Sequence, residues 1–263
     1  MTNKILTRER DKTLEIVLNR PEKRNAIDLD MLHGLHDAVQ QALRTEGLRS
    51  VVLRGEGSCF SAGIDVTALM SLSQVYGEGW LQRMRSITRD IQAVSNAFEQ
   101  LEVPVIALLH GHCLGLGLEL ALACDMRFAC VGTSLALPET RLGLIPDVGG
   151  STRLARLVGP ARAKDLIFTG RRIPAETAER WGLVDRLVPV DGLDPELDAW
   201  LEELAYAAPL AVGMAKRVID GAFDLHRGLE LEGWAQSQLV GCEDMAEAMQ
   251  AFMSKRRPEF KGR

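Results

Sequence analysis

The chain has 263 residues, 46% of them hydrophobic and 25% charged, which is the composition of a soluble globular protein of one large domain or two modest ones. The formal net charge of −5 disfavours nucleic acid as a partner, because a polyanion would need a local basic patch. No apolar run reaches membrane-spanning length, and the first fifteen residues lack the apolar segment of a signal peptide. Five cysteines without CxxC pairing indicate reduced, mostly buried thiols, so we expect a cytoplasmic protein without a membrane partner.

The N-terminal half alternates short strands with helices. Residues 14–18 alternate in the manner of a strand, which Arg20 and Pro21 end. Asp28 is suited to cap a helix whose apolar positions recur at helical spacing, namely Leu32, Leu35, Val39 and Leu43. Residues 51–53 predict a short buried strand, and residues 80–101 predict one long helix whose apolar stripe packs in the core.

The C-terminal half begins with a buried strand at 103–109, a glycine-rich turn at 111–117, a helix at 117–123 and a strand at 126–129. Helices follow at 151–157, 160–168 and 174–181, the last ended by Gly182, and then a strand at 183–188. Beyond Asp194 only helices are predicted, at 195–207, 210–223, 228–240 and 244–252. We therefore expect an α/β core over residues 1–195 and a helical region over 196–263, packed together because no Gly/Ser-rich linker separates them.

Two glycine-containing turns, residues 59–65 and 111–119, concentrate unusual residues. Each places glycine beside a backbone N–H that could point into a cleft, and two such groups can hold an oxyanion. A helix starting near Gly117 would add the positive end of its dipole. The alternative is two ordinary tight turns. A dinucleotide fingerprint is excluded, because Leu120 stands where its third glycine belongs and Glu119 would repel a pyrophosphate.

Three carboxylates follow these turns. Glu119 lies in the first turn of an apolar helix, where burial should raise its pKa, although it could also serve only as a partner of the helix dipole. Glu139 follows another apolar run. Asp147 precedes two glycines and could be either a functional acid or the N-cap of the helix after Ser151.

Four segments resemble signatures of the enoyl-CoA hydratase/isomerase (crotonase) family: residues 19–26 (NRPEKRNA), 60–65 (FSAGID), 111–125 and 138–150. Their order and spacing fit along essentially the whole chain. The resemblance implies a spiral of ββα units with a C-terminal helical trimerisation region. It also implies a homo-oligomer, either a trimer or a dimer of trimers, with an acyl-CoA substrate. No metal or redox cofactor is implied, since CoA arrives with the substrate, and His110 and His112 have no partner at metal-ligand spacing.

The same resemblance assigns roles to individual positions. The backbone N–H groups of Ile64 and Leu116 would hold the thioester oxygen, while Glu119 and Glu139 would handle one water in the hydration of a trans-2-enoyl-CoA. CoA contacts are implied for Arg24, Ala26, Ala62, Ile64 and Asp65, and, toward the CoA of a neighbouring subunit, for Phe252 and Lys255. The basic run 255–257 could otherwise be a solvated terminus.

Three positions depart from the hydratase pattern. Ile64 stands where hydratases commonly have alanine and Leu116 where glycine is usual, so the acyl pocket should be reshaped. Asp147 stands where hydratases have a small residue. An acid there is similar to the Δ3,5-Δ2,4-dienoyl-CoA isomerases, which would use Glu139 and Asp147. We expect an enoyl-CoA hydratase, with this isomerase as the alternative. A hydrolase of 3-hydroxyacyl-CoA such as 3-hydroxyisobutyryl-CoA is a further alternative, although those enzymes lack an acid at the position of Glu119. A non-catalytic CoA- or RNA-binding scaffold is disfavoured by the three acids and the acidic balance.

Overall fold

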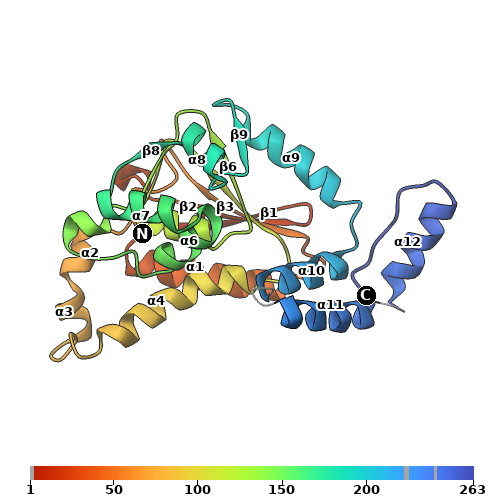
Figure 1. Ribbon diagram of the computed structural model, residues 1–263, viewed down its shortest axis with the longest axis horizontal. Coiled ribbons are helices and arrows are strands. Elements are labelled where there is room, and N and C mark those ends of the chain that lie inside the picture. The colour runs from red at the N-terminus through yellow and green to blue at the C-terminus, as the bar shows by residue number, and fades with distance from the viewer. Residues whose placement is uncertain (1–2, 222–224, 240–241) are drawn as a thin grey trace.

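A computed structural model describes residues 3–221, 225–239 and 242–263 (Figure 1). Its main sheet has six strands in the order β1-β2-β3-β4-β6-β9, and only the β1–β2 pair is antiparallel. These strands are β1 (Ile5–Arg10), β2 (Thr13–Leu18), β3 (Ser50–Gly55), β4 (Val105–Leu109), β6 (Met126–Cys130) and β9 (Arg186–Val188). A second sheet has the order β5-β7-β8, with β5 (His112–Leu114), β7 (Ser134–Ala136) and β8 (Ile173–Pro174).

Helices connect and cover these strands (Figure 1). Those of the first half are α1 (Leu29–Arg44), α2 (Val66–Met70), α3 (Leu72–Tyr76), α4 (Met84–Glu99) and α5 (Leu116–Leu122). Those that follow are α6 (Gly150–Val158), α7 (Pro160–Thr169), α8 (Ala175–Trp181), α9 (Leu193–Leu204), α10 (Pro209–Gly221), α11 (Leu225–Leu239) and α12 (Glu243–Met253). Two 3-10 turns, η1 (Pro21–Lys23) and η2 (Glu139–Leu142), complete the described elements.

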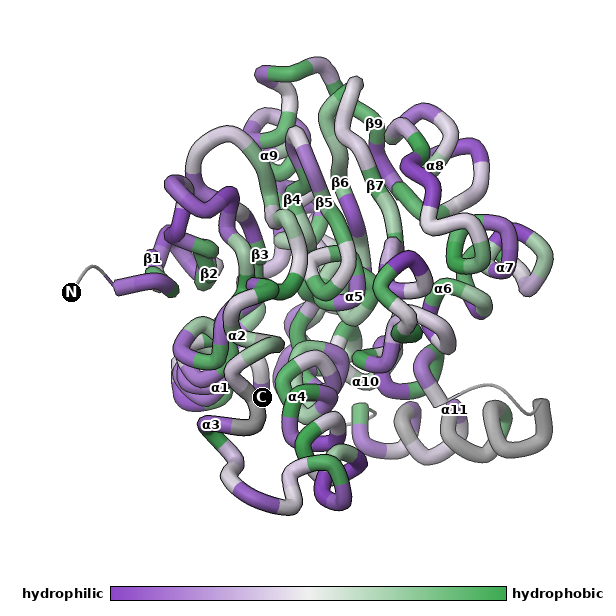
Figure 2. Tube along the Cα trace, turned by 90° about the vertical axis from the view of Figure 1, so that its left-hand side faces the viewer, coloured by the Kyte–Doolittle hydropathy of each residue, from purple (hydrophilic) through white to green (hydrophobic). Residues whose placement is uncertain are grey.

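Both faces of the main sheet are covered, which explains why its strands are apolar on both sides. Val51, Leu53 and Val105 of β3 and β4 face the larger core beside α1, α4 and α5. The alternate residues Val52 and Ile106 face the opposite way, toward a smaller cluster with α9. Figure 2 shows the hydrophobic colour concentrated on these central strands. The sheet thereby fixes where the turns at its edges lie.

Most predicted elements are confirmed. Asp28 caps α1 by accepting a hydrogen bond from the Met31 N–H, and Gly182 ends α8 in the left-handed conformation. The long helix predicted from residue 80 begins only at Met84, so its first four residues were assigned wrongly. Gly79 has a φ of +75° and Leu81 is exposed, so no burial holds an additional turn there.

Several elements had no counterpart in the sequence prediction. β1 carries four exposed positions and so shows no alternation of apolar residues. The strands β5, β7 and β8 are two or three residues long, too short for a periodic signal. The short helices α2 and α3, over 66–70 and 72–76, were also missed.

The last described strand is β9, and the tail beyond it is helical, as predicted. The proposed boundary after residue 195 falls within α9, whose buried Leu193 and Leu197 pack on the sheet. The predicted ends of two tail helices, Phe223 and Val240, lie outside the described residues. Figure 1 shows α12 standing at one end of the molecule. No helix within the described ranges is long and apolar enough to cross a membrane.

Candidate active site

One cavity of about 250 Å³ brings together the three carboxylates and both predicted oxyanion positions. Glu119 comes from α5, Glu139 from η2 and Asp147 from the loop before α6. Ile64 and Leu116 line the same cavity. The remaining wall is largely apolar and includes Ile27, Leu29, Leu32, Ala68, Met84, Ile91, Leu144, Ile145 and Val148. Five residues far apart in the sequence thus share one mostly apolar cavity.

The two glycine turns lie against each other. Gly63 has a φ of +96°, and a Cβ on it would lie 2.8 Å from the carbonyl oxygen of Leu114. Gly115 has a φ of +51°, and a Cβ there would lie 2.9 Å from Glu139 Oε1. Glycine is therefore required at both positions, for the conformation and for the close approach of a neighbouring oxygen.

The residues that follow these glycines carry unengaged donors. Within the described part of the chain, neither the Ile64 N–H nor the Leu116 N–H donates a hydrogen bond. Leu116 is the first residue of α5, where a helix leaves its N–H groups without an intrahelical acceptor. Each N–H belongs to a residue that lines the cavity.

Glu119 is almost fully buried, with 2% of its surface exposed. Its Oε1 accepts hydrogen bonds from the N–H groups of Val148, at 2.8 Å, and Gly150, at 2.9 Å. Burial raises the pKa of Glu119 to about 8, and the charges of Glu139 and Asp147 add to the rise, while the two N–H groups oppose it. Because both bonds go to Oε1, Oε2 is the oxygen left for a ligand.

Glu139 has the second perturbed carboxyl. Its Oε2 is buried and has no hydrogen-bond partner among the described residues. The pKa of Glu139 is raised to about 6, mainly by burial and in smaller part by the charge of Asp147. An unpartnered carboxyl oxygen in an apolar cavity is costly, and such costs are typical of functional sites.

Asp147 is not the helix cap that the sequence allowed. The N-cap of α6 is Gly149, and no side chain caps that helix. Asp147 Oδ2 instead accepts a hydrogen bond of 3.0 Å from Thr88 Oγ1 on α4. Its carboxylate therefore lies at the rim shared by α4 and the cavity.

The residues predicted to contact CoA fall into two groups. Arg24, Ala26, Ala62 and Asp65 lie on adjoining turns, since the Ala62 N–H donates to the Arg24 carbonyl and the Asp65 N–H donates to the Ile27 carbonyl. Arg20, which sequence reasoning treated only as a turn residue, donates to Asp65 Oδ2 at 2.6 Å and to the Ala26 carbonyl at 3.0 Å. Together with a bond from Thr67, it lowers the pKa of Asp65 to about 2.

Phe252 and Lys255 do not join this group within one chain. Phe252 is 80% exposed on α12, and Lys255 follows the end of that helix. Figure 1 places α12 at the opposite end of the molecule from α2, which follows the 62–65 turn. Contact with a neighbouring subunit's CoA stays a prediction.

No group of three or more His, Cys, Asp or Glu side chains within the described residues is arranged to hold a metal ion. His110 Nε2 lies 3.0 Å from the Gly57 carbonyl oxygen.

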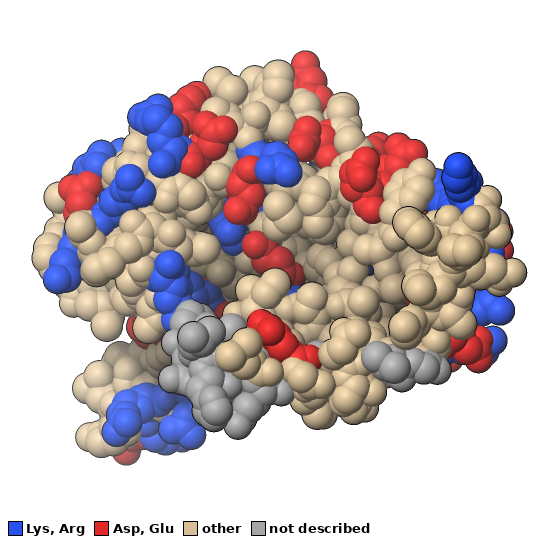
Figure 3. Space-filling model, turned by 45° about the vertical axis from the view of Figure 1, so that its right-hand side comes forward, with Lys and Arg blue, Asp and Glu red and all other residues tan. Residues whose placement is uncertain are grey.

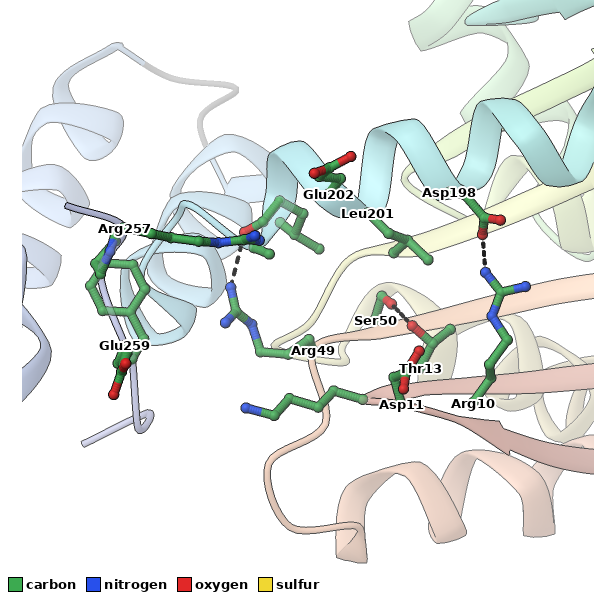
Figure 4. A pocket seen from close by; sticks show the side chains of 15 residues that line it. Arg10, Asp11, Thr13, Arg49, Ser50, Asp198, Leu201, Glu202, Arg257 and Glu259 are labelled. Carbon is green, nitrogen blue, oxygen red and sulfur yellow. Dashed lines mark hydrogen bonds and ion pairs between the residues drawn. The ribbon is translucent and has the colours of Figure 1, made fainter.

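A larger cavity of about 760 Å³ lies elsewhere, between the β1–β2 turn, α9 and the C-terminal segment (Figure 4). Several of its polar side chains are paired: Thr13 and Ser50 share a hydrogen bond, Arg10 pairs with Asp198, and Arg49 donates to two backbone carbonyls. None of the predicted site residues lines it. Over the face in Figure 3, cationic and anionic side chains are interspersed.

Sequence reasoning missed the polar side chains around the loop of residues 146–150, which binds Glu119. Thr88, Gln92, Asn96 and Arg153 all bond to that loop or to one another. A signal was present, because the first three recur every four residues on a helix that was described only by its apolar stripe.

Residues 8–263 match the family model described as enoyl-CoA hydratase/isomerase. The chain belongs to this family. The spacing of motifs predicted it, and the comparisons confirm both the family and the crotonase fold.

Relatives and solved structures of the same family are similar to this chain over nearly its full length. The putative enoyl-CoA hydratase/isomerase YngF of Bacillus subtilis is 38% identical over 250 residues, which cover 94% of each chain. The enoyl-CoA isomerase/hydratase fer4 of Mycosarcoma maydis is 37% identical, covering 94% of this chain and 92% of its own. The crystal structure of an enoyl-CoA hydratase from Bacillus anthracis superposes with a TM-score of 0.90 at 38% identity, covering 99% of this chain and 100% of its own. The relatives' names include both hydratase and isomerase.

Proposed function

We propose that this protein hydrates trans-2-enoyl-CoA thioesters. The observation that carries the proposal is the pairing of Glu119 and Glu139 in one apolar cavity, with pKa values near 8 and 6. Between about pH 6 and pH 8 the two carboxyl groups together hold one proton. Hydration needs such a pair, because one carboxylate takes a proton from water while the other carboxyl delivers a proton to the α-carbon.

The electrophile would be activated by the two free backbone donors. As water oxygen bonds to the β-carbon, negative charge moves to the thioester oxygen. The Ile64 and Leu116 N–H groups, both at the cavity and both without an acceptor, are suited to stabilise that charge. The α-carbon then takes its proton from the protonated carboxyl, and the carboxyl pair is left with one proton. No metal or redox cofactor enters this chemistry.

The substrate would approach over the adjoining turns that carry Arg24, Ala26, Ala62 and Asp65, with its acyl chain in the apolar cavity. Family resemblance further suggests a cytoplasmic trimer or dimer of trimers in which α12 supplies Phe252 and Lys255 to a neighbouring subunit's CoA.

A second function is favoured by one observation. Asp147 lines the same cavity as Glu139, so a proton could be moved between two carbons of a 3,5-dienoyl-CoA by these acids. This would make the protein a Δ3,5-Δ2,4-dienoyl-CoA isomerase.

The test is an activity panel of trans-2-enoyl-CoA thioesters of several chain lengths and a 3,5-dienoyl-CoA. Hydration is monitored by the loss of enoyl absorbance and isomerisation by the gain of conjugated dienoyl absorbance, and the product is identified by its mass. Glu119→Gln and Glu139→Gln should each lower hydration by about 100-fold or more. Glu46→Gln, at an exposed position on the surface, is the matched control. Failure to hydrate every enoyl-CoA would exclude the hydratase. Conversion of the dienoyl-CoA that Asp147→Asn abolishes would establish the isomerase.

A further inference from the structure

The loop of residues 146–150 supplies both N–H groups that bind Glu119, and helix α4 holds this loop at its outer side. Thr88 Oγ1 donates to Asp147 Oδ2 at 3.0 Å, and Gln92 Nε2 donates to the Asp147 carbonyl oxygen at 2.5 Å. These bonds fix the loop one residue before Val148, whose N–H is the first donor to Glu119.

Arg153, in α6, links the same loop to the C-terminal half of α4. Its side chain is 9% exposed. One guanidinium nitrogen, Nη1, donates to the Val148 carbonyl oxygen at 3.2 Å. The other, Nη2, donates to Asn96 Oδ1 at 2.6 Å and Glu99 Oε2 at 2.7 Å. A planar, permanently charged guanidinium is suited to hold several acceptors in fixed directions.

The four α4 residues in these contacts lie on one side of the helix. Thr88, Gln92, Asn96 and Glu99 are separated by four, four and three residues, which is the spacing of one helical face. The stripe runs beside the apolar positions that pack in the core. All of its described side-chain hydrogen bonds are to residues 147 and 153.

Space around the loop is limited from both sides. Gly149 has a φ of +102°, and a Cβ on it would lie 1.9 Å from Arg153 Nη1. A Cβ on Gly150 would lie 2.8 Å from Glu119 Oε1. The guanidinium and the carboxylate therefore occupy the space that side chains at residues 149 and 150 would need, so both are packed directly against the loop backbone.

We propose that Arg153 is a positioning residue for Glu119, acting through the Val148 carbonyl and the loop of residues 146–150. This inference rests on the proposed acid/base role of Glu119. Holding the carbonyl of Val148 orients the peptide chain so that the Val148 and Gly150 N–H groups both meet Oε1. The proton-carrying oxygen, Oε2, is then directed at the substrate.

The pH dependence supplies a specific readout. The charged groups around the cavity beside Glu119 are Glu139, Asp147 and Asp28. The first two raise its pKa, and the two loop N–H groups lower it. Loosening the loop weakens the two N–H hydrogen bonds that lower the pKa of Glu119. The pKa of Glu119 should then rise, so the alkaline limb of activity should move to higher pH.

The experiment compares Arg153→Met with wild type in hydration assays over a range of pH. We expect kcat to fall by about tenfold to 100-fold with little change in KM, and the alkaline limb to move upward. Arg153→Lys keeps the charge and should recover part of kcat. Asn96→Ala is a milder change that should lower kcat and raise the alkaline limb in the same way. It replaces Arg153→Met as the test variant if Arg153→Met fails to fold.

Arg54→Met is the control, because it breaks the pair with Asp194 on the α9 side of the sheet and contacts neither α4 nor the loop. It should leave kcat and the alkaline limb unchanged. Wild-type kcat, or a lowered kcat with an unmoved alkaline limb, in the Arg153 and Asn96 variants would overturn the inference. Unchanged hydration by Glu119→Gln would instead refute the proposed function itself, so the two failures are distinguishable.

Discussion

Replacing Glu119 by glutamine should stabilise the protein at neutral pH while removing its activity. The glutamine carbonyl oxygen can accept the N–H groups of Val148 and Gly150 as Oε1 does, so the loop keeps its contacts. What disappears is the titration of a carboxyl that is 2% exposed.

The magnitude follows from the two pKa values of this group. The pKa of Glu119 is raised from 4.5 in the unfolded chain to about 8 in the folded protein. The folded protein therefore keeps the proton in a window where the unfolded chain releases it. Raising the pH through that window favours unfolding, at about 1.4 kcal/mol per pH unit. Between pH 4.5 and pH 7 the wild type should lose about 3 kcal/mol relative to Glu119→Gln.

The assay is urea unfolding of both proteins at several pH values from 4.5 to 8, at one protein concentration because oligomerisation would contribute. The free energy of unfolding of the variant minus that of the wild type should be near zero at pH 4.5 and increase to pH 7. Glu46→Gln should give no such slope. If the difference in free energy of unfolding does not change with pH, Glu119 is not a buried carboxyl that stays protonated in the folded protein. If the variant is less stable at every pH, the contacts of the loop require the acid.

Three further results are expected. The pH profile of kcat/KM should be bell-shaped, falling below about pH 6 as Glu139 gains a proton and above about pH 8 as Glu119 loses one; a single flat profile from pH 5 to 9 would contradict the one-proton pair. Gly63→Ala should cost about 1 to 3 kcal/mol in thermal unfolding and lower kcat strongly, because its Cβ would lie 2.8 Å from the Leu114 carbonyl oxygen at a φ of +96°. Met84→Trp should narrow the cavity and lower kcat/KM for long acyl chains more than for short ones, which a chain-length series would show or disprove.

The sequence by itself determined much of the scaffold. Helical spacing located α1, and alternation located β2. The buried strands β3 and β4 could be predicted because parallel strands covered on both faces are apolar throughout. Motif order identified the family, and the apolar sequence around Glu119 indicated that this residue is buried.

Only the tertiary structure decided which partners the acids have. Glu119 is bonded to Val148 and Gly150, 29 and 31 residues away, and Asp147 bonds to Thr88 instead of capping α6. Periodicity reports only which side of an element is buried, whereas these partners are set by which loops the sheet brings together. β1 and β5 escaped prediction because one is largely exposed and the other is only three residues long, so neither carries a periodic apolar pattern, and each is defined by its pairing with β2 or β7.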